Sequence, residues 1–105
     1  MSTGIHVVLF SAASADDISR IGRVLVEERL AACVNVFTSI RSIYRWEGKL
    51  QEQPEAMGLA KTREERVEEL VERVRALHGY LVPEVLVLPV EGGNPVYLKW
   101  VAEST

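Results

Sequence analysis

The sequence predicts an α+β fold, and three observations support this assignment. Two short runs rich in β-branched residues, Ile5–Phe10 and Val85–Leu88, are typical of buried strands. Two other stretches repeat apolar residues every three or four positions, which indicates amphipathic helices. Between them, much of Leu30–Thr62 alternates in side-chain polarity with the period of two expected of strands. We therefore expect residues 1–105 to form one domain that combines a sheet with helices.

A helix is expected directly after the first strand. Ser14 stands three residues before Asp17, which is the spacing of a capping box and marks a helix start. The small and apolar positions that follow share one helical face: Ile18, Ile21, Gly22 and Leu25. The helical pattern fades near Ala31–Cys33, and a strand pattern begins at Val34.

The central segment predicts a long β-hairpin that turns at Glu47-Gly48-Lys49. Its arms run from about Val34 to Trp46 and from Leu50 to Thr62. Strands are usually about five or six residues long, so arms of this length must project beyond a small domain. Alternation puts Ser42, Tyr44 and Trp46 on one face, and the opposite face carries Arg41, Ile43 and Arg45.

A second helix is expected after the hairpin. Thr62 and Glu65 have the spacing of another capping box, and Gly79 supplies the stop. The apolar positions between them fall on one stripe: Val67, Leu70, Val71, Val74 and Leu77. Glu69 and Arg73 are spaced for an ion pair on the outer face.

The C-terminal part predicts a strand and a short helix. Val85–Leu88 suits a strand buried on both faces, and Pro89 ends its ladder or lies at an edge. Asn94 is a natural N-cap and Pro95 fits the first helical position. The order is strand, helix, strand, strand, helix, strand, helix. With right-handed crossovers this order gives a ferredoxin-like split βαβ sandwich, with two helices on one face of a mostly antiparallel sheet.

Composition excludes several classes of protein. A net charge of −3 argues against binding to nucleic acid, which requires a basic face. The single cysteine, Cys33, forms no internal disulfide, and the first ten residues lack the pattern of a signal peptide. No apolar run reaches about 18 residues, so we expect no membrane span. These features predict a cytoplasmic location.

Candidate metal ligands are few and scattered. Cys and His residues show no close ligand spacing such as C-x2-C, so a site requires folding to bring distant residues together. His78, Cys33 and Glu84 form the candidate set for such a site. The competing interpretation makes Cys33 a small buried hydrophobe and His78 a partner of the preceding helix C-terminus.

Several motifs in the same order resemble the CutA family of divalent-cation tolerance proteins across nearly the whole chain. The matching segments are Leu30–Asn35, Ser42–Lys49, Lys61-Thr62, His78 with Tyr80, Pro83-Glu84, Pro89, Gly93-Asn94, Tyr97-Leu98 and Trp100. The resemblance implies a ferredoxin-like homotrimer associated with tolerance to copper and other divalent metals. The chain departs from the family pattern at Gly79 and Leu81, and at Phe10 and Ser11, where some relatives carry a cysteine. These departures remove potential ligands and count against copper binding. Because the chain has no second Cys and no His close to His78 in sequence, we expect at most weak binding of Cu²⁺ or another divalent cation, with no cofactor required.

The projecting hairpin requires a partner for its aromatic residues, which we expect to be a neighbouring subunit. The predicted trimer interface comprises Tyr44, Trp46, Ile43 and Arg45. Two alternatives remain open: a small-molecule or anion-binding trimer that resembles the PII signalling proteins, and a purely structural interaction module. No nucleophile motif, Walker A run or dinucleotide fingerprint is present, so we expect no enzymatic activity.

Overall fold

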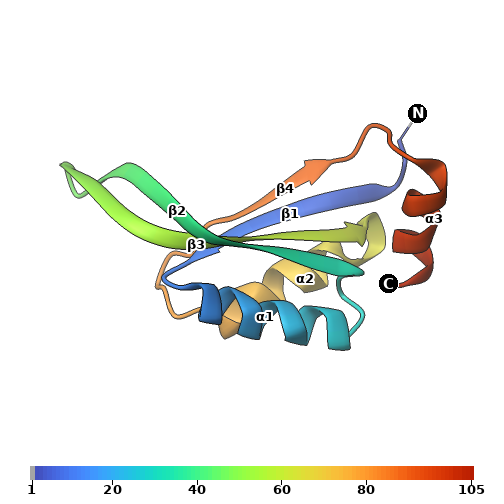
Figure 1. The fold of residues 1–105 in the computed structure, drawn as a ribbon, viewed down its shortest axis with the longest axis horizontal. Helices are drawn as coiled ribbons and strands as arrows, with labels where there is room; N and C mark the ends of the chain where they lie inside the picture. Colours follow the sequence, from blue (N-terminus) through green and yellow to red (C-terminus); the bar gives the residue numbers. More distant parts are fainter. Residues whose placement is uncertain (1) are drawn as a thin grey trace.

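A computed structural model describes residues 2–105 and contains the predicted elements in the predicted order (Figure 1). The elements are β1 (Ile5–Ala12), α1 (Ala15–Glu27), β2 (Cys33–Trp46), β3 (Lys49–Arg63), α2 (Glu64–Leu77), β4 (Val85–Pro89) and α3 (Pro95–Glu103). The sheet has the order β2-β3-β1-β4, and every neighbouring pair is antiparallel. Helices α1 and α2 lie side by side against one face, and α3 lies at the end of the sheet opposite the hairpin. This arrangement confirms the predicted α+β fold.

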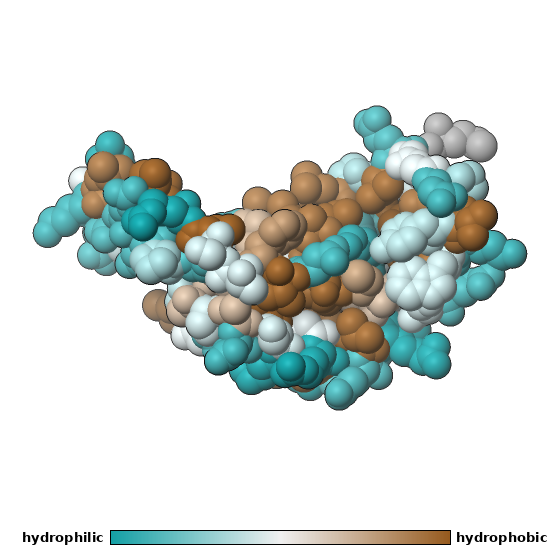
Figure 2. Space-filling model, in the orientation of Figure 1, coloured by the Kyte–Doolittle hydropathy of each residue, from teal (hydrophilic) through white to brown (hydrophobic). Residues whose placement is uncertain are grey.

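The core lies between the sheet and the two long helices. Val8 and Phe10 of β1 are fully buried against α1 and α2 residues of the same cluster: Ile18, Ile21, Leu25, Leu70 and Val74. Alternate strand residues point to opposite faces, so Val7 and Leu9 point away from this core. The register pairs them with Leu88 and Leu86 of β4, whose side chains are 49% and 54% exposed. The face away from the long helices is therefore apolar and partly uncovered, and Figure 2 shows apolar residues gathered along the middle of the molecule.

Ser14 caps α1 as predicted. Its hydroxyl accepts a hydrogen bond from the Asp17 backbone N–H at 3.2 Å. The four predicted face positions of α1 are buried: Ile18, Ile21, Gly22 and Leu25. At the other end of the chain, the Asn94 side chain accepts from the Val96 N–H at 3.1 Å, and Pro95 is the first residue of α3. Both helix starts were therefore readable from local chemistry.

The hairpin projects far beyond β1 and β4, as expected. Strands β2 and β3 contain 14 and 15 residues, whereas β1 and β4 contain 8 and 5. Trp46 pairs with Lys49 across a two-residue turn in which Glu47 and Gly48 have φ of 49° and 77°. Positive φ at both central residues is the signature of a type I′ turn, whose twist matches that of the strands. The elongated molecule measures 44 × 27 × 22 Å.

A β-bulge interrupts the pairing of β2 with β3. Phe37 pairs with Met57, but the next pair is Ile40 with Glu55, so β2 carries one extra residue between them. Before the bulge, odd-numbered residues of β2 lie opposite odd-numbered residues of β3, and after it even-numbered residues of β2 do so. Asn35 lies opposite Leu59 before the bulge, and Tyr44 lies opposite Gln51 after it. The even-numbered aromatic residues therefore face the same side as the odd-numbered residues of β3.

The predicted capping box of Thr62 and Glu65 is wrong. Strand β3 continues to Arg63, which is the N-cap of α2 and makes no side-chain capping bond within residues 2–105. Thr62 is instead completely buried in the sheet, opposite His6 of β1. The strand pairing with β1 overrides the local capping signal because it satisfies the backbone of this segment along its whole length.

Two further predictions about packing are wrong. Strand β4 is a sheet edge and not a strand buried on both faces, since it pairs only with β1 and leaves Leu86, Val87 and Leu88 exposed within the described chain. Arg73 does not pair with Glu69. Its guanidinium donates two hydrogen bonds to Glu28 at 2.8 and 2.9 Å, which ties α2 to the end of α1 and lowers the pKa of the Glu28 carboxyl.

Gly58 lets β3 approach the core closely, and we expect Gly58→Ala to destabilise the protein. A Cβ at this position would stand 2.5 Å from Cζ of Phe10, so the ring or the strand must shift. Overpacking of this kind costs about 1–3 kcal/mol, which urea denaturation measures directly. Gly79→Ala is the matched control because nothing lies within 4 Å of its added Cβ. Equal stability of the two variants would contradict this account, and Phe10→Leu should partly restore the Gly58→Ala protein.

Candidate functional site

A groove of about 640 Å³ lies where the hairpin leaves the body of the protein. We call it the hairpin groove. The end of β1, the hairpin arms and the segment that leads into β4 each contribute to it. Its lining residues are Ser11, Ser42, Ile43, Tyr44, Trp46, Gln53, Glu55, Tyr80, Leu81, Val82 and Glu84. This volume lies within the range of small-molecule sites, roughly 300–1,000 Å³.

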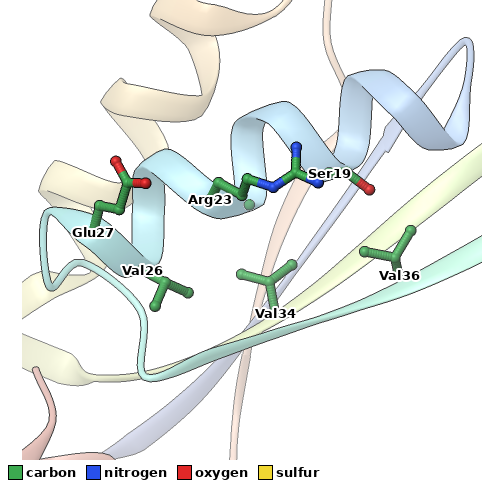
Figure 3. Close-up of a pocket in the computed structure, with 7 residues that line it drawn as sticks. Ser19, Arg23, Val26, Glu27, Val34 and Val36 are labelled. Carbon is green, nitrogen blue, oxygen red and sulfur yellow. The ribbon is translucent and has the colours of Figure 1, made fainter.

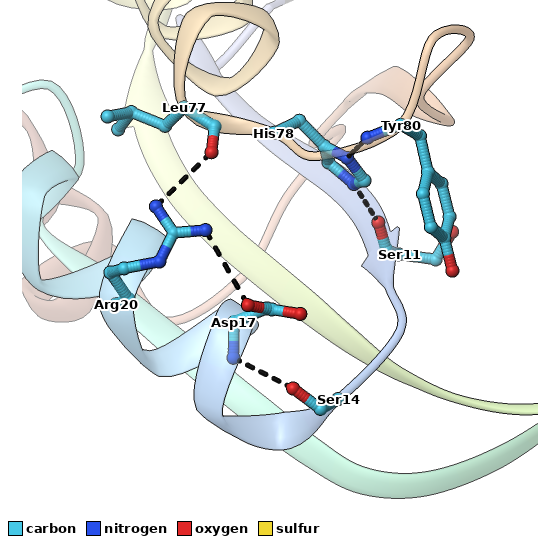
Figure 4. Close-up of polar contacts among 7 residues, drawn as sticks. All are labelled: Ser11, Ser14, Asp17, Arg20, Leu77, His78 and Tyr80. Carbon is cyan, nitrogen blue, oxygen red and sulfur yellow. Dashed lines mark hydrogen bonds and ion pairs between the residues drawn. The ribbon is translucent and has the colours of Figure 1, made fainter.

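His78 contacts two residues that line the groove, Ser11 and Tyr80 (Figure 4). Its Nε2 lies 2.5 Å from the carbonyl oxygen of Ser11, and its Nδ1 accepts a hydrogen bond from the Tyr80 backbone N–H at 3.0 Å. Since Nδ1 accepts, Nε2 carries the proton and donates to the carbonyl. Both ring nitrogens therefore hold the segment after α2 against the end of β1. A metal ion at Nδ1 would first have to displace the Tyr80 N–H.

The C-terminus of α2 is satisfied by a neighbouring helix. His78 is the C-cap residue, but the Leu77 carbonyl accepts its hydrogen bond from the Arg20 guanidinium of α1 at 3.2 Å. Asp17 lies 3.6 Å from the same guanidinium, as Figure 4 shows. The cationic partner expected at this helix end is therefore Arg20, while His78 orders the chain that follows.

Tyr80 and Glu55 form a polar contact at the groove. The phenol donates a hydrogen bond to the Glu55 carboxylate at 2.9 Å, and the rings of Tyr80 and His78 lie 4.7 Å apart. Partial burial raises the pKa of Tyr80 to about 12, and the hydrogen bond and negative charge of Glu55 act in the same direction. The contact joins the middle of β3 to the segment before β4 and connects two residues that line the groove.

The structure does not bring the three predicted metal ligands together. Glu84 accepts a hydrogen bond from the Ser11 hydroxyl at 3.4 Å, which puts it close to the residue that His78 contacts. Cys33 begins β2 opposite Lys61, whose partner on β1 is Val7. Val7 is four residues from Ser11, or about 13 Å along the strand. Within residues 2–105, no group of three or more His, Cys, Asp or Glu side chains is arranged to hold a metal ion.

Cys33 lies in a different environment near α3. It is half-buried and not the fully buried hydrophobe that its competing interpretation implied. Its Sγ is 3.7 Å from Nζ of Lys61. Burial raises the pKa of the Tyr97 phenol, and the neighbouring Cys33 adds to the effect. This cluster belongs to the contact between α3 and the sheet.

The residues of the predicted trimer interface are exposed. The exposed fractions are 63% for Ile43, 37% for Tyr44 and 50% for Trp46, which are high values for apolar side chains. Arg45 donates to the Gly48 carbonyl of its own turn at 3.4 Å. Ile43, Tyr44 and Trp46 also line the hairpin groove. The sequence identified these residues but gave no indication that they share a groove with Glu55 and Tyr80, because the two segments are joined only by the fold.

A second groove, of about 450 Å³, lies between α1 and the outer edge of β2 (Figure 3). Val34 and Val36 of β2 form its floor together with Val26 of α1, and Arg23 and Glu27 lie along its helical wall. Gly22 lets α1 sit close to the strand, since a Cβ there would lie 3.2 Å from Cγ1 of Val34. The groove has an apolar floor and follows the edge of β2 that pairs with no other strand of residues 2–105.

The fold defines a class of small α+β sandwich proteins with one antiparallel sheet, two helices on one face and a long hairpin. Residues 6–104 match the family described as CutA1 divalent ion tolerance protein. The chain belongs to this family, which confirms the resemblance predicted from the sequence.

Relatives and solved structures agree with this assignment. The divalent-cation tolerance protein CutA of Thermus thermophilus is 48% identical over 100 residues, which cover 95% of this chain and 97% of the relative. The CutA homolog of Xenopus laevis is 55% identical over 83 residues, or 79% of this chain and 55% of the relative, so the chain spans little more than half of that protein. The solved structure of Cut A1 from Thermus thermophilus superposes with a TM-score of 0.93 and 46% identity, covering 96% of this chain and 98% of that one.

The predicted cytoplasmic location is contradicted. A relative from Archaeoglobus fulgidus is described as a periplasmic divalent cation tolerance protein CutA; it is 36% identical, with a TM-score of 0.91 over 95% of this chain and 97% of that one. The prediction failed because a lone cysteine excludes only an internal disulfide, and a fold that needs no disulfide is compatible with either compartment. None of the helices within residues 2–105 has the length and apolar character needed to cross a membrane.

Partial burial of the Tyr80 phenol, together with its hydrogen bond to Glu55, should make stability fall at high pH. The folded-state pKa of Tyr80, about 12, lies above its ordinary value of 10, so the folded protein holds this proton more tightly than the unfolded chain. The resulting stabilisation is complete below pH 10 and is lost as the pH rises towards 12. We expect Tyr80→Phe to be less stable than the parent at pH 8 and to lose less stability between pH 10 and 12.

Urea denaturation of the two proteins at a series of pH values measures this difference. Tyr97 provides the matched control, since the pKa of its phenol is also raised but it lies outside the groove. Parallel stability curves for the parent and Tyr80→Phe would show that folding does not raise the pKa of the Tyr80 phenol.

Proposed function

We propose that the protein acts in divalent-metal tolerance as a ring of three copies, without catalysing a reaction. The metal-tolerance role rests on the family and on the names of the relatives. The observation that carries the assembly is the partly uncovered apolar face of the sheet, bounded by two free edges within the described chain. The absence of catalysis is supported by His78, the histidine beside the groove, because both of its ring nitrogens are held by the backbone.

Strand direction allows the two edges to pair between copies. Every neighbouring pair in β2-β3-β1-β4 is antiparallel, so β2 and β4 run in opposite directions. When copies are related by rotation about an axis along the strands, β4 of one copy meets β2 of the next in antiparallel orientation. Such a head-to-tail contact repeats around the axis, and three copies close it into a ring without a remaining edge. Closure also removes the aggregation risk of exposed strand edges.

Apolar surface supports the same assembly. Leu86, Val87 and Leu88 of β4 are at least 40% exposed. Val87 pairs with Val8 and therefore points to the helical side of the sheet. In an edge pair, the neighbour's Val87 would lie beside the apolar floor of the groove between α1 and β2. The far part of β2, residues 40–46, extends past β4 and would bring Ile43, Tyr44, Trp46 and Arg45 against the segment that precedes the neighbour's β4.

We expect metal binding by this protein to be weak. Glu84 and His78 are the only two of the three predicted ligands that approach the same residue, Ser11. Cu²⁺ prefers imidazole nitrogen, but the Nδ1 lone pair of His78 is occupied by the Tyr80 N–H. Binding at this atom must therefore break a hydrogen bond that orders the groove.

The PII-like alternative, an anion-binding site, is disfavoured by charge. Two carboxylates, Glu55 and Glu84, line the hairpin groove, and its described lining includes no Lys, Arg or His. The groove between α1 and β2 offers Arg23, but Glu27 lies on the same wall. Neither groove presents the cluster of cationic groups that phosphate recognition uses.

We predict a particle of three chains that depends on the hairpin aromatics. Trp46→Ala should weaken assembly most and Tyr44→Ala second, because buried aromatic anchors contribute about 2 kcal/mol or more each to such interfaces. Light scattering at several concentrations measures the mass of each variant. Glu68→Gln is the control because this residue is exposed on α2 and distant from the hairpin. A monodisperse monomer of the parent at micromolar concentration would refute the assembly.

We predict that Cu²⁺ binds with a dissociation constant weaker than about 1 μM. His78→Ala should lose most of this binding, since it removes the imidazole that contacts the same residue, Ser11, as Glu84 does. Cys33→Ala is the matched control and should bind as the parent does, because Cys33 lies at the other end of the sheet. Calorimetry distinguishes these outcomes. Submicromolar affinity that survives His78→Ala would place the copper site elsewhere.

A further inference from the structure

Arg29 adopts a backbone conformation that favours glycine. Its φ is 59°, and its N–H donates to the Val26 carbonyl at 3.1 Å. The next N–H, that of Leu30, donates to the Leu25 carbonyl at 2.9 Å. Together these bonds form a Schellman motif at the end of α1, in which Arg29 lies at the position that usually holds glycine. An L side chain is disfavoured there, so arginine at this position points to a function of its side chain.

The Arg29 guanidinium has no acidic partner within residues 2–105. Arg29 is exposed, and none of the ion pairs in this part of the chain includes it. Interaction with the α1 dipole is a weaker explanation, because Arg73 already supplies a guanidinium at this helix end, bonded to Glu28. Glu91 is also exposed and, within the same residues, also has no ion-pair partner. An unpaired cation therefore lies just before β2, and an unpaired anion just after β4, the two edge strands of the sheet.

We propose that Arg29 of one copy forms an ion pair with Glu91 of the next copy, at the end of each joint between β2 and β4 in the ring. The pair rests on the proposed trimer and adds to it a contact that fixes the register of the joined strands. Each copy contributes the cation to one joint and the anion to the other. A closed ring of three copies therefore contains three identical pairs.

Side-chain alternation limits the register of the joint. The part of β2 before the bulge, Cys33–Phe37, is as long as β4, Val85–Pro89. Val87 points to the helical side of the sheet, as do Val34 and Val36, which form the floor of the groove beside α1. Opposed residues of paired strands share a face. When the two segments overlap almost completely, Val87 of one copy must therefore lie opposite Val34 or Val36 of the other.

Both registers bring Glu91 within reach of Arg29. Antiparallel pairing puts Glu91, which is four residues after Val87, opposite Leu30 in one register and Ala32 in the other. Arg29 is one or three residues from the opposed position, or at most about 10 Å along an extended chain. The long arginine and glutamate side chains together can span this distance.

The two charges lie on the same side of the joint. Val90 donates its N–H to the Ile5 carbonyl at 3.0 Å, so the chain after β4 continues along the ladder with β1. Alternation then puts Glu91 on the helical side of the sheet, with Val87. Arg29 lies on this side because it directly follows α1. The sheet therefore does not separate the guanidinium from the carboxylate.

Charge reversal tests the ion pair. Arg29→Glu and Glu91→Arg each turn three attractive contacts into repulsive ones. We expect each to raise the dissociation constant of the trimer at least about tenfold at low salt. The double variant Arg29→Glu/Glu91→Arg exchanges the charges and should return to within about threefold of the parent. Light scattering over a dilution series, in urea that partly dissociates the parent, measures each constant.

Salt and two further variants separate the ion pair from local effects at the helix end. Sodium chloride at about 1 M should bring both single variants close to the parent, because the Debye length then falls to about 3 Å. Arg29→Gly keeps the backbone conformation and removes the charge, so it should also weaken assembly at low salt. Arg23 lies six residues earlier on α1, about 9 Å along the axis, so Glu91→Arg should not restore Arg23→Glu.

The outcomes distinguish the ion pair from the ring. A monomeric parent overturns the trimer and the ion pair with it. In a trimeric parent, single variants that assemble as tightly as the parent overturn the ion pair alone, as does a double variant that is as weak as the single ones. Losses that are equal at low salt and at 1 M sodium chloride would assign the effect to the fold of the helix end. Restoration of Arg23→Glu by Glu91→Arg would show that Arg29 is not the partner of Glu91.

Discussion

The difference in strand length determines the other features of this molecule. Strands β2 and β3 contain 14 and 15 residues, and their neighbours β1 and β4 contain 8 and 5. The paired arms therefore extend beyond the core. No helix or other strand of the described chain covers their distal halves. This excess length creates the groove at the hairpin base, exposes the aromatic residues and extends the free edge of β2. The surfaces proposed for assembly are a consequence of this difference in strand length.

His78 illustrates how a potential ligand becomes a structural element. Its two ring nitrogens connect the carbonyl of Ser11 to the N–H of Tyr80, so the imidazole donates to a β1 carbonyl just beyond the last pair of the β1–β4 ladder, Phe10 with Val85. Tyr80 is then directed towards Glu55. The histidine thereby positions a phenol and a carboxylate, and its own capacity to bind metal is reduced by the same bonds.

Structural features that depend on interactions between residues close in the chain could be predicted from the sequence. The Ser14 cap, the Glu47-Gly48 turn and the alternation of the hairpin arms involve residues close in the chain, and all were predicted. Thr62 was misassigned because a pairing partner more than fifty residues away, His6, holds it in β3. The exposure of β4 and the contact of Tyr80 with Glu55 depend on the order of strands and on the path of residues 78–84. An apolar strand sequence alone does not show whether the strand is buried in the centre of the sheet or exposed at its edge.

The bulge between Phe37 and Ile40 determines where this strand tolerates changes in length. It absorbs one extra residue and so keeps Tyr44 on the same side as Gln51 and Glu55. Loss of that residue would restore regular pairing and leave the aromatic side chains facing as they do now. A single insertion or deletion between residues 40 and 46 would instead rotate part of the arm and turn Trp46 or Tyr44 to the opposite side. We therefore expect natural insertions and deletions in this arm to occur at residues 38–39, and the length of residues 40–46 to stay constant.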